Sequence, residues 1–151
     1  MLPRIDYSVV VPVSAELAFR AFTDLNRLLN RGIYEQASWT EGTPWKVGSR
    51  IRYVVAKPRE ATIAAVVTAC EPAHYVAILN HAMGVTAEQQ VSFVESPNAG
   101  STRVRMLVEF VGKSPDLPDN VVHEAITFYT HDALDTMADL CRKWKAASSA
   151  E

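Results

Sequence analysis

The sequence predicts a fold of the α+β class, in which a curved antiparallel sheet of seven strands surrounds one long C-terminal helix. Between residues 35 and 111, short segments of alternating apolar and other residues are separated by turn-forming Gly, Pro and Asn. Residues 119–147 contain no Gly or Pro, and their apolar residues recur every three or four positions. Because an apolar sheet face must be covered, and this helix is the element long enough to do so, we expect the sheet to curl around it.

The N-terminal segment predicts one strand followed by two short helices. Residues Ile5 to Val11 alternate and are rich in β-branched types, and Pro12 ends this strand. Ser14 is a suitable N-cap for a first short helix, and Asp24 is suitable for a second short helical segment that ends near Gly32. Both helices therefore lie between the first and second strands.

Six further strands follow, joined by turns. We expect them at residues 35–40, 50–56, 62–69, 75–80, 89–95 and 102–111. The alternation is clearest in the last one, where Val104, Met106, Val108 and Phe110 share a face. Short turns between consecutive strands imply antiparallel neighbours.

The long helix is expected over residues 119–147. Its apolar stripe consists of Val122, Ile126, Tyr129, Ala133, Met137, Leu140 and Trp144. Acidic Asp119 and Glu124 near its start, and basic Arg142 and Lys143 near its end, suit the helix dipole. At 1.5 Å per residue this helix is about 40 Å long.

Composition limits the classes of partner. The chain has 151 residues, which suits one domain (1–151, with a core of about 5–147), and 48% of them are hydrophobic. Fifteen Lys and Arg against seventeen Asp and Glu give a net charge of −2, so we expect no nucleic-acid partner. No apolar run approaches the roughly 18 residues that span a bilayer, so we expect no membrane insertion. We expect a monomer or a weak homodimer.

The two cysteines, Cys70 and Cys141, form no CxxC pair and are interpreted as small buried residues in a reducing, cytoplasmic setting. The sequence has no Gly-rich dinucleotide or phosphate motif, and we expect no cofactor. His123 and His131 are eight residues apart on the helix, too far to share one metal ion, so no metal site is expected.

Several local phrases resemble one known family. They are VPVSAELAFRAFTD (11–24), WTEGTPWKVGSRIRYVV (39–55), ACEP (69–72) and ESPNAGSTRVRM (95–106), followed by the long terminal helix. In this order they resemble the START-like superfamily (SRPBCC), which includes the major birch pollen allergen and bacterial polyketide cyclase/dehydrase-like proteins. The resemblance covers about residues 5–147. It implies a helix-grip fold with a cavity for lipids, polyketides, steroids or other apolar ligands, and it carries over no catalytic set.

A cavity is also expected on physical grounds, because one helix covers the ends of a strongly twisted seven-stranded sheet poorly. Its lining is taken from the inward faces of the strands and the apolar stripe of the helix. The predicted ligand-binding residues are Tyr53, Gln89, Val91, Phe93, Met106, Val108, Phe110, Val122, Ile126, Tyr129 and Ala133.

Four polar residues are the candidates for chemistry: Tyr53, His81, Gln89 and Tyr129. A phenol in a cavity donates to a ligand or acts as a general acid, but a buried Tyr53 or Tyr129 can equally bond the backbone. Gln89 points inward if its strand is regular, and is solvated if that end of the strand frays. His81 lies either at the cavity rim or on the surface.

Three functions remain open at this point. The first is a binding or carrier protein for a small apolar or amphipathic molecule, which the absence of a catalytic motif favours. The second is a cyclase, aromatase or dehydratase that acts on a polyketide-like carbonyl compound without metal or nucleotide. The third is a protein-interaction module like the cochaperone branch of the same fold, which requires an exposed apolar patch instead of an enclosed pocket.

Overall fold

The computed structural model describes residues 2–98 and 100–149. Its elements follow in the predicted order of one strand, two short helices, six strands and a long helix. The strands are β1 (Ile5–Val11), β2 (Tyr34–Glu41), β3 (Arg50–Val55), β4 (Ala61–Glu71), β5 (Tyr75–Ala82), β6 (Val85–Glu95) and β7 (Thr102–Lys113). The helices are α1 (Ala15–Phe22), the 3-10 helix η1 (Leu25–Arg31) and α2 (Asp119–Ser149).

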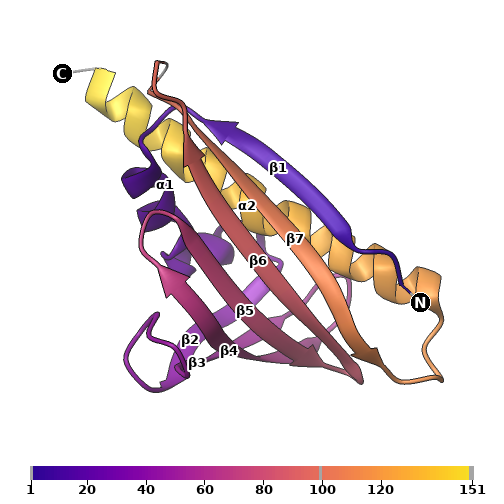
Figure 1. Ribbon diagram of the computed structural model, residues 1–151. Coiled ribbons are helices and arrows are strands. Elements are labelled where there is room, and N and C mark those ends of the chain that lie inside the picture. Colours follow the sequence, from indigo (N-terminus) through magenta and orange to yellow (C-terminus); the bar gives the residue numbers. More distant parts are fainter. Residues whose placement is uncertain (1, 99, 150–151) are drawn as a thin grey trace.

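The seven strands form an antiparallel sheet in the order β1-β7-β6-β5-β4-β3-β2. Figure 1 shows this sheet curving around α2, which crosses behind the strands. The predicted α+β helix-grip arrangement is therefore confirmed.

The two short helices begin at the capping residues expected from the sequence. The Ser14 hydroxyl accepts a hydrogen bond of 3.3 Å from the Leu17 amide, and the Asp24 carboxylate accepts one of 3.1 Å from the Asn26 amide. Gly32 follows η1 with φ of 72°, a left-handed conformation that glycine adopts without steric cost. These caps fix the path of the chain from the edge strand β1 to the opposite edge strand β2.

The β5–β6 hairpin is longer than predicted. Both strands extend to a two-residue turn, Met83 and Gly84, whose φ angles of 51° and 80° are typical of tight hairpins. The polar run from Glu88 to Gln90 therefore lies well inside a regular strand rather than at a frayed end. Pairing of Gln89 with Ile78 and Val108 holds its backbone in place on both sides.

Helix α2 leaves part of the sheet uncovered on the inside. Its predicted apolar stripe does face the core, with Val122, Ala133 and Met137 buried and the remaining members packed against the core. However, its backbone lies mainly against β1, α1 and η1 rather than against the middle strands. A space therefore remains between α2 and the inner face of those strands.

Candidate functional site

That space is a cavity of about 510 Å³. Side chains from the end of α1, from η1, from the inner faces of β2–β7 and from the N-terminal half of α2 contribute to its walls. Its volume lies within the range of about 300–1,000 Å³ that is typical of small-molecule sites.

Apolar side chains make up most of the wall. Those from η1 and the sheet include Leu25, Leu28, Val55, Ile63, Ile78, Ala87 and Val108, and those from α2 include Val122, Ile126 and Ala133. These positions belong to the inward faces that strand alternation and helical spacing define. A cavity with such walls favours a ligand with a large apolar part.

The mouth of the cavity is marked by the lining residues that are also exposed. They are Pro58 and Arg59 in the β3–β4 loop, Met83 in the β5–β6 turn, and Val121, Glu124 and Phe128 in α2. The turn is fixed to the chain before α2, because the Ser114 amide donates a 2.7 Å hydrogen bond to the Gly84 carbonyl oxygen. These six residues form the mouth of the cavity.

Three lining residues are both polar and buried, namely Arg27, Tyr34 and Tyr53, and the part of the wall that they form is called the closed end. They are 4%, 8% and 8% exposed, and all three line the cavity. The rings of Tyr34 and Tyr53 pack edge to face with centroids 5.7 Å apart. Among the described residues neither hydroxyl has a hydrogen-bond partner, which is uncommon for a buried phenol.

Burial sets the protonation of these groups. It raises the pKa of Tyr53 to about 12, with Arg27 opposing the rise, and it also raises the pKa of Tyr34. Burial lowers the pKa of Arg27 to about 10. At neutral pH the two phenols are therefore protonated hydrogen-bond donors and the guanidinium is charged.

Two amide side chains extend the polar lining along the sheet. Asn80 and Gln89 lie on the adjacent strands β5 and β6, line the cavity and have no side-chain hydrogen bond within residues 2–98 and 100–149. Tyr129 differs from them, because its hydroxyl donates a 2.8 Å hydrogen bond to the carbonyl oxygen of Lys57. Tyr129 thus lines the cavity with its ring, while its hydroxyl joins α2 to the β3–β4 loop.

The structure divides the residues predicted to bind a ligand into two groups. Tyr53, Gln89, Val108, Val122, Ile126, Tyr129 and Ala133 line the cavity. Val91, Phe93 and Met106 face inward but are buried in the packed core instead, and the Phe93 ring lies 5.5 Å from Phe19 and 5.9 Å from Phe22 of α1. The division falls between the cross-strand pair of Gln89 with Val108 and the next pair, Val91 with Met106.

Phe110 and His81 also lie outside the cavity wall. The Phe110 ring packs near His123, with centroids 6.2 Å apart. His81 is exposed, and its Nδ1 is 2.8 Å from the Thr86 hydroxyl. Because side chains alternate along a strand, the inward orientation of the neighbouring Asn80 and Ala82 directs His81 to the outer face.

Arg27 and Tyr34 also line the cavity, although the sequence did not predict them as lining residues. Tyr34 lies one residue before the predicted start of its strand, and a β-bulge between Tyr34 and Gln36 shifts the register, so alternation from the later residues does not place it. An arginine between the leucines of a short helix is ordinarily a surface residue. No sequence signal distinguishes Arg27 from Arg31, which is exposed in the same helix.

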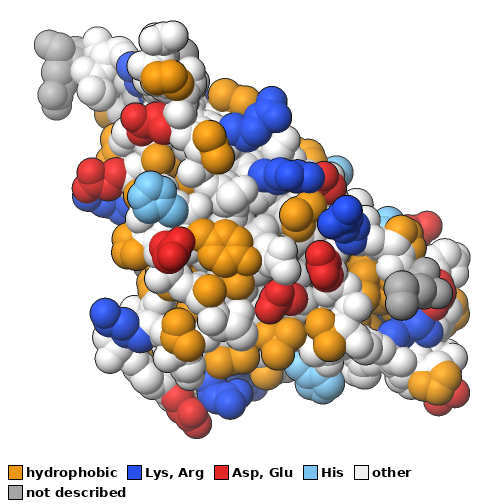
Figure 2. Space-filling model, viewed as in Figure 1, with side chains coloured by type: hydrophobic (Ala, Val, Ile, Leu, Met, Phe, Trp, Pro, Cys, Tyr) orange, Lys and Arg blue, Asp and Glu red, His pale blue; other side chains and the backbone are white. Residues whose placement is uncertain are grey.

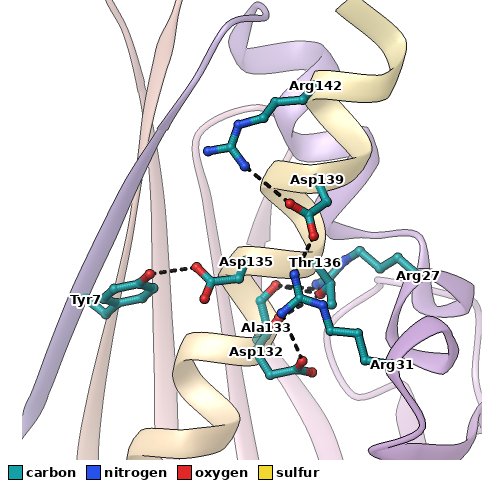
Figure 3. Close-up of polar contacts among 9 residues, drawn as sticks. All are labelled: Tyr7, Arg27, Arg31, Asp132, Ala133, Asp135, Thr136, Asp139 and Arg142. Atoms are coloured by element: carbon teal, nitrogen blue, oxygen red, sulfur yellow. Dashed lines mark hydrogen bonds and ion pairs between the residues drawn. The ribbon is translucent and has the colours of Figure 1, made fainter.

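A second polar cluster joins η1 to α2 (Figure 3). Asp132 of α2 is 4% exposed, and neither of its carboxylate oxygens accepts a hydrogen bond from a described residue. Its partner is Arg31, whose Nη1 is 3.7 Å from Asp132 Oδ1 and whose Nη2 also pairs with Asp139. Burial raises the pKa of Asp132, while Arg31 and Arg27 oppose the rise.

Within residues 2–98 and 100–149, no three His, Cys, Asp or Glu side chains are grouped so that they could share a metal ion. None of the helices in these ranges has both the length and the hydropathy needed to cross a bilayer.

Comparison with known proteins identifies the fold. The sequence matches no protein-family model and no curated protein. Among solved structures, the Zhui aromatase/cyclase from Streptomyces sp. R1128 is 15% identical and superposes with a TM-score of 0.79 over 95% of both chains. A START superfamily protein from Mycobacterium smegmatis is 14% identical, with a TM-score of 0.75 over 93% of this chain and 98% of its own.

Norcoclaurine synthase from Thalictrum flavum is similar to the same extent, with 15% identity and a TM-score of 0.71 over 96% of this chain and 97% of its own. At these identities the likeness concerns the fold. The chain has the helix-grip fold of the START-like superfamily.

Proposed function

We propose that the protein binds one small apolar or amphipathic molecule in the cavity between the sheet and α2. The observation that carries this proposal is the cavity itself, with a volume of about 510 Å³ and mainly apolar walls. Side chains that line an empty space lack dispersion partners on one side. A ligand with an apolar body supplies those contacts, and its transfer from water adds the hydrophobic contribution.

The experiment combines native mass spectrometry with a fluorescence titration. Protein purified from its own host is analysed for a co-purified small molecule, and the ligand-free protein is titrated with N-phenyl-1-naphthylamine, a neutral dye that brightens in apolar surroundings. We expect saturable binding of one dye per chain, reversed by the co-purified molecule. Failure to bind this dye or any neutral alkyl or aromatic compound of similar size would refute the proposal.

A second candidate function is catalysis on a carbonyl compound of the polyketide type. The hydroxyls of Tyr34 and Tyr53 favour it, because unpaired, protonated donors in a buried cavity suit the polarisation of a carbonyl oxygen. Two of the structural neighbours are named as an aromatase/cyclase and a synthase. Loss of turnover in Tyr53→Phe with retained affinity for the substrate would support this function, and unchanged turnover would count against it.

A protein-interaction function has less support. Three of the large exposed apolar side chains, Met83, Val121 and Phe128, border the mouth and thus belong to the cavity rather than to a separate surface. Figure 2 shows the outer face of the sheet, where blue and red side chains are interspersed among the orange ones. A mixed surface of this kind is ordinary for the solvent-exposed face of a sheet and favours no particular partner.

A further inference from the structure

The closed end of the cavity holds hydrogen-bond donors in excess of acceptors. Arg27, Tyr34 and Tyr53 all line it, and the two phenols have no partner among the described residues. Helix η1, which carries Arg27, packs against β2, which carries Tyr34, and the rings of Tyr34 and Tyr53 are 5.7 Å apart. Neutral phenols and a guanidinium can all donate hydrogen bonds to an oxygen acceptor.

Arg27 binds only neutral groups of the protein. Its Nη1 donates to the Ala133 carbonyl oxygen and to the Thr136 hydroxyl, both at 2.7 Å. Its Nε donates to the carbonyl oxygens of Ala21 and Phe22, and one N–H of Nη2 donates to Phe22 at 3.1 Å. The second N–H of Nη2 has no acceptor in the part of the chain that the structure describes.

The charge of Arg27 is also without a direct ion pair among residues 2–98 and 100–149. Asp132, the buried carboxylate nearby, does not line the cavity, and its ion pair is with Arg31 (Figure 3). The other charged residues of the wall, Arg59 and Glu124, are exposed at the mouth. Among the described residues that line the closed end, the charged one is therefore Arg27.

We infer that the ligand carries a carboxylate at one end, and that this group lies against Arg27, Tyr34 and Tyr53 with the apolar body directed to the mouth. This inference rests on the proposed function and adds the chemical class of the ligand. A carboxylate has acceptor sites for several donors at once. Hydrogen bonds from a guanidinium to a carboxylate are charge-assisted and stronger than those between neutral groups.

The dimensions of the cavity suit this orientation. Along α2, Glu124 lies at the mouth and Ala133 beside Arg27, and the helix rises about 13 Å between them at 1.5 Å per residue. The walls between these ends are apolar, apart from Asn80 and Gln89. A molecule with one acidic end and an apolar body thus meets matching surroundings along its length.

The experiment compares three twelve-carbon amphiphiles, dodecanoate, dodecan-1-ol and dodecylamine, by isothermal titration calorimetry at neutral pH below their aggregation concentrations. We expect dodecanoate to bind about tenfold or more tightly than dodecan-1-ol, and dodecylamine to bind weakest. Tyr34→Phe and Tyr53→Phe should each weaken dodecanoate binding several-fold and leave dodecan-1-ol binding nearly unchanged. Tyr75→Phe, which removes a phenol that does not line the cavity, is the matched control.

A stability readout separates a ligand contact from a structural role. Because neither hydroxyl has a partner in the protein, Tyr34→Phe and Tyr53→Phe should not lower the melting temperature of the ligand-free protein. If neither the amphiphiles nor N-phenyl-1-naphthylamine binds, the proposed function itself fails. If the dye binds and none of the amphiphiles does, the carboxylate inference alone is overturned. If dodecan-1-ol or dodecylamine binds as tightly as dodecanoate, or if both variants keep wild-type affinity for dodecanoate, the carboxylate inference is overturned while the binding function stands.

Discussion

The Arg27 side chain donates a 2.7 Å hydrogen bond from Nη1 to the carbonyl oxygen of Ala133, and so joins η1 to the middle of α2 (Figure 3). The same nitrogen donates to the Thr136 hydroxyl, which in turn donates to the carbonyl oxygen of Asp132. This contact is therefore one of those that position α2, which lies mainly against β1, α1 and η1.

Arg27→Met should destabilise the protein by roughly 2–5 kcal/mol, because it removes the hydrogen bonds that a buried guanidinium donates to the carbonyl oxygens of Ala21, Phe22 and Ala133. The free energy of unfolding is measured by urea denaturation. Arg142→Met is the control, since it removes an exposed ion pair with Asp139 that contributes about 0–1 kcal/mol. Equal, small effects of the two substitutions would show that the Arg27 contacts are not structural.

Asp132→Asn should make stability less dependent on pH. Burial raises the pKa of Asp132 in the folded protein, so between the ordinary carboxyl pKa and the raised one the folded state binds more protons than the unfolded state. The contribution of Asp132 to the free energy of unfolding therefore falls as pH rises through that range. Relative to wild type, Asp132→Asn should be more stable at neutral pH, and this difference should shrink as the pH falls towards 4.

The measurement is thermal denaturation of both proteins between pH 4 and pH 8. Asp116→Asn, in the exposed loop before α2, is the control and should parallel the wild-type profile. A wild-type advantage that grows as pH rises would mean that the Asp132 carboxylate is stabilised in the fold, contrary to this expectation.

Ala87→Leu should reduce the affinity for N-phenyl-1-naphthylamine by about tenfold or more, because the added atoms occupy the cavity from the inner face of β6. Ala64→Leu adds the same atoms on the exposed face of β4 and should leave the affinity unchanged. The dye titration is carried out on both variants, with melting temperatures to establish that each is folded. Equal affinities of the two folded variants would place the dye elsewhere.

The architecture could be predicted because it depends on patterns that a single sequence contains. Alternation in β7 and the three-to-four spacing in α2 are local, and both elements begin at the predicted residues. The boundary of the cavity cannot be predicted from such local patterns. Gln89 and Phe93 share the inner face of β6, yet one lines the cavity and the other packs against α1.

Alternation therefore defines which face a side chain is on, but the position of α1 across the sheet decides whether that side chain meets the cavity or the core. Arg27 escaped prediction for a related reason. Its burial follows from the approach of η1 to α2, over a separation of more than a hundred residues in the chain. Only the assembled fold brings Arg27, Tyr34 and Tyr53 to the same end of the cavity.

The most direct measurement is a crystal structure of the protein with 12-bromododecan-1-ol, in which anomalous scattering locates the bromine atom. We expect one bromine site per chain in the space between α2 and the inner face of the middle strands, enclosed by residues such as Ile78, Val108 and Ile126. Bromine found only on the outer face of the sheet, or an unoccupied cavity at saturating ligand, would contradict an internal binding site.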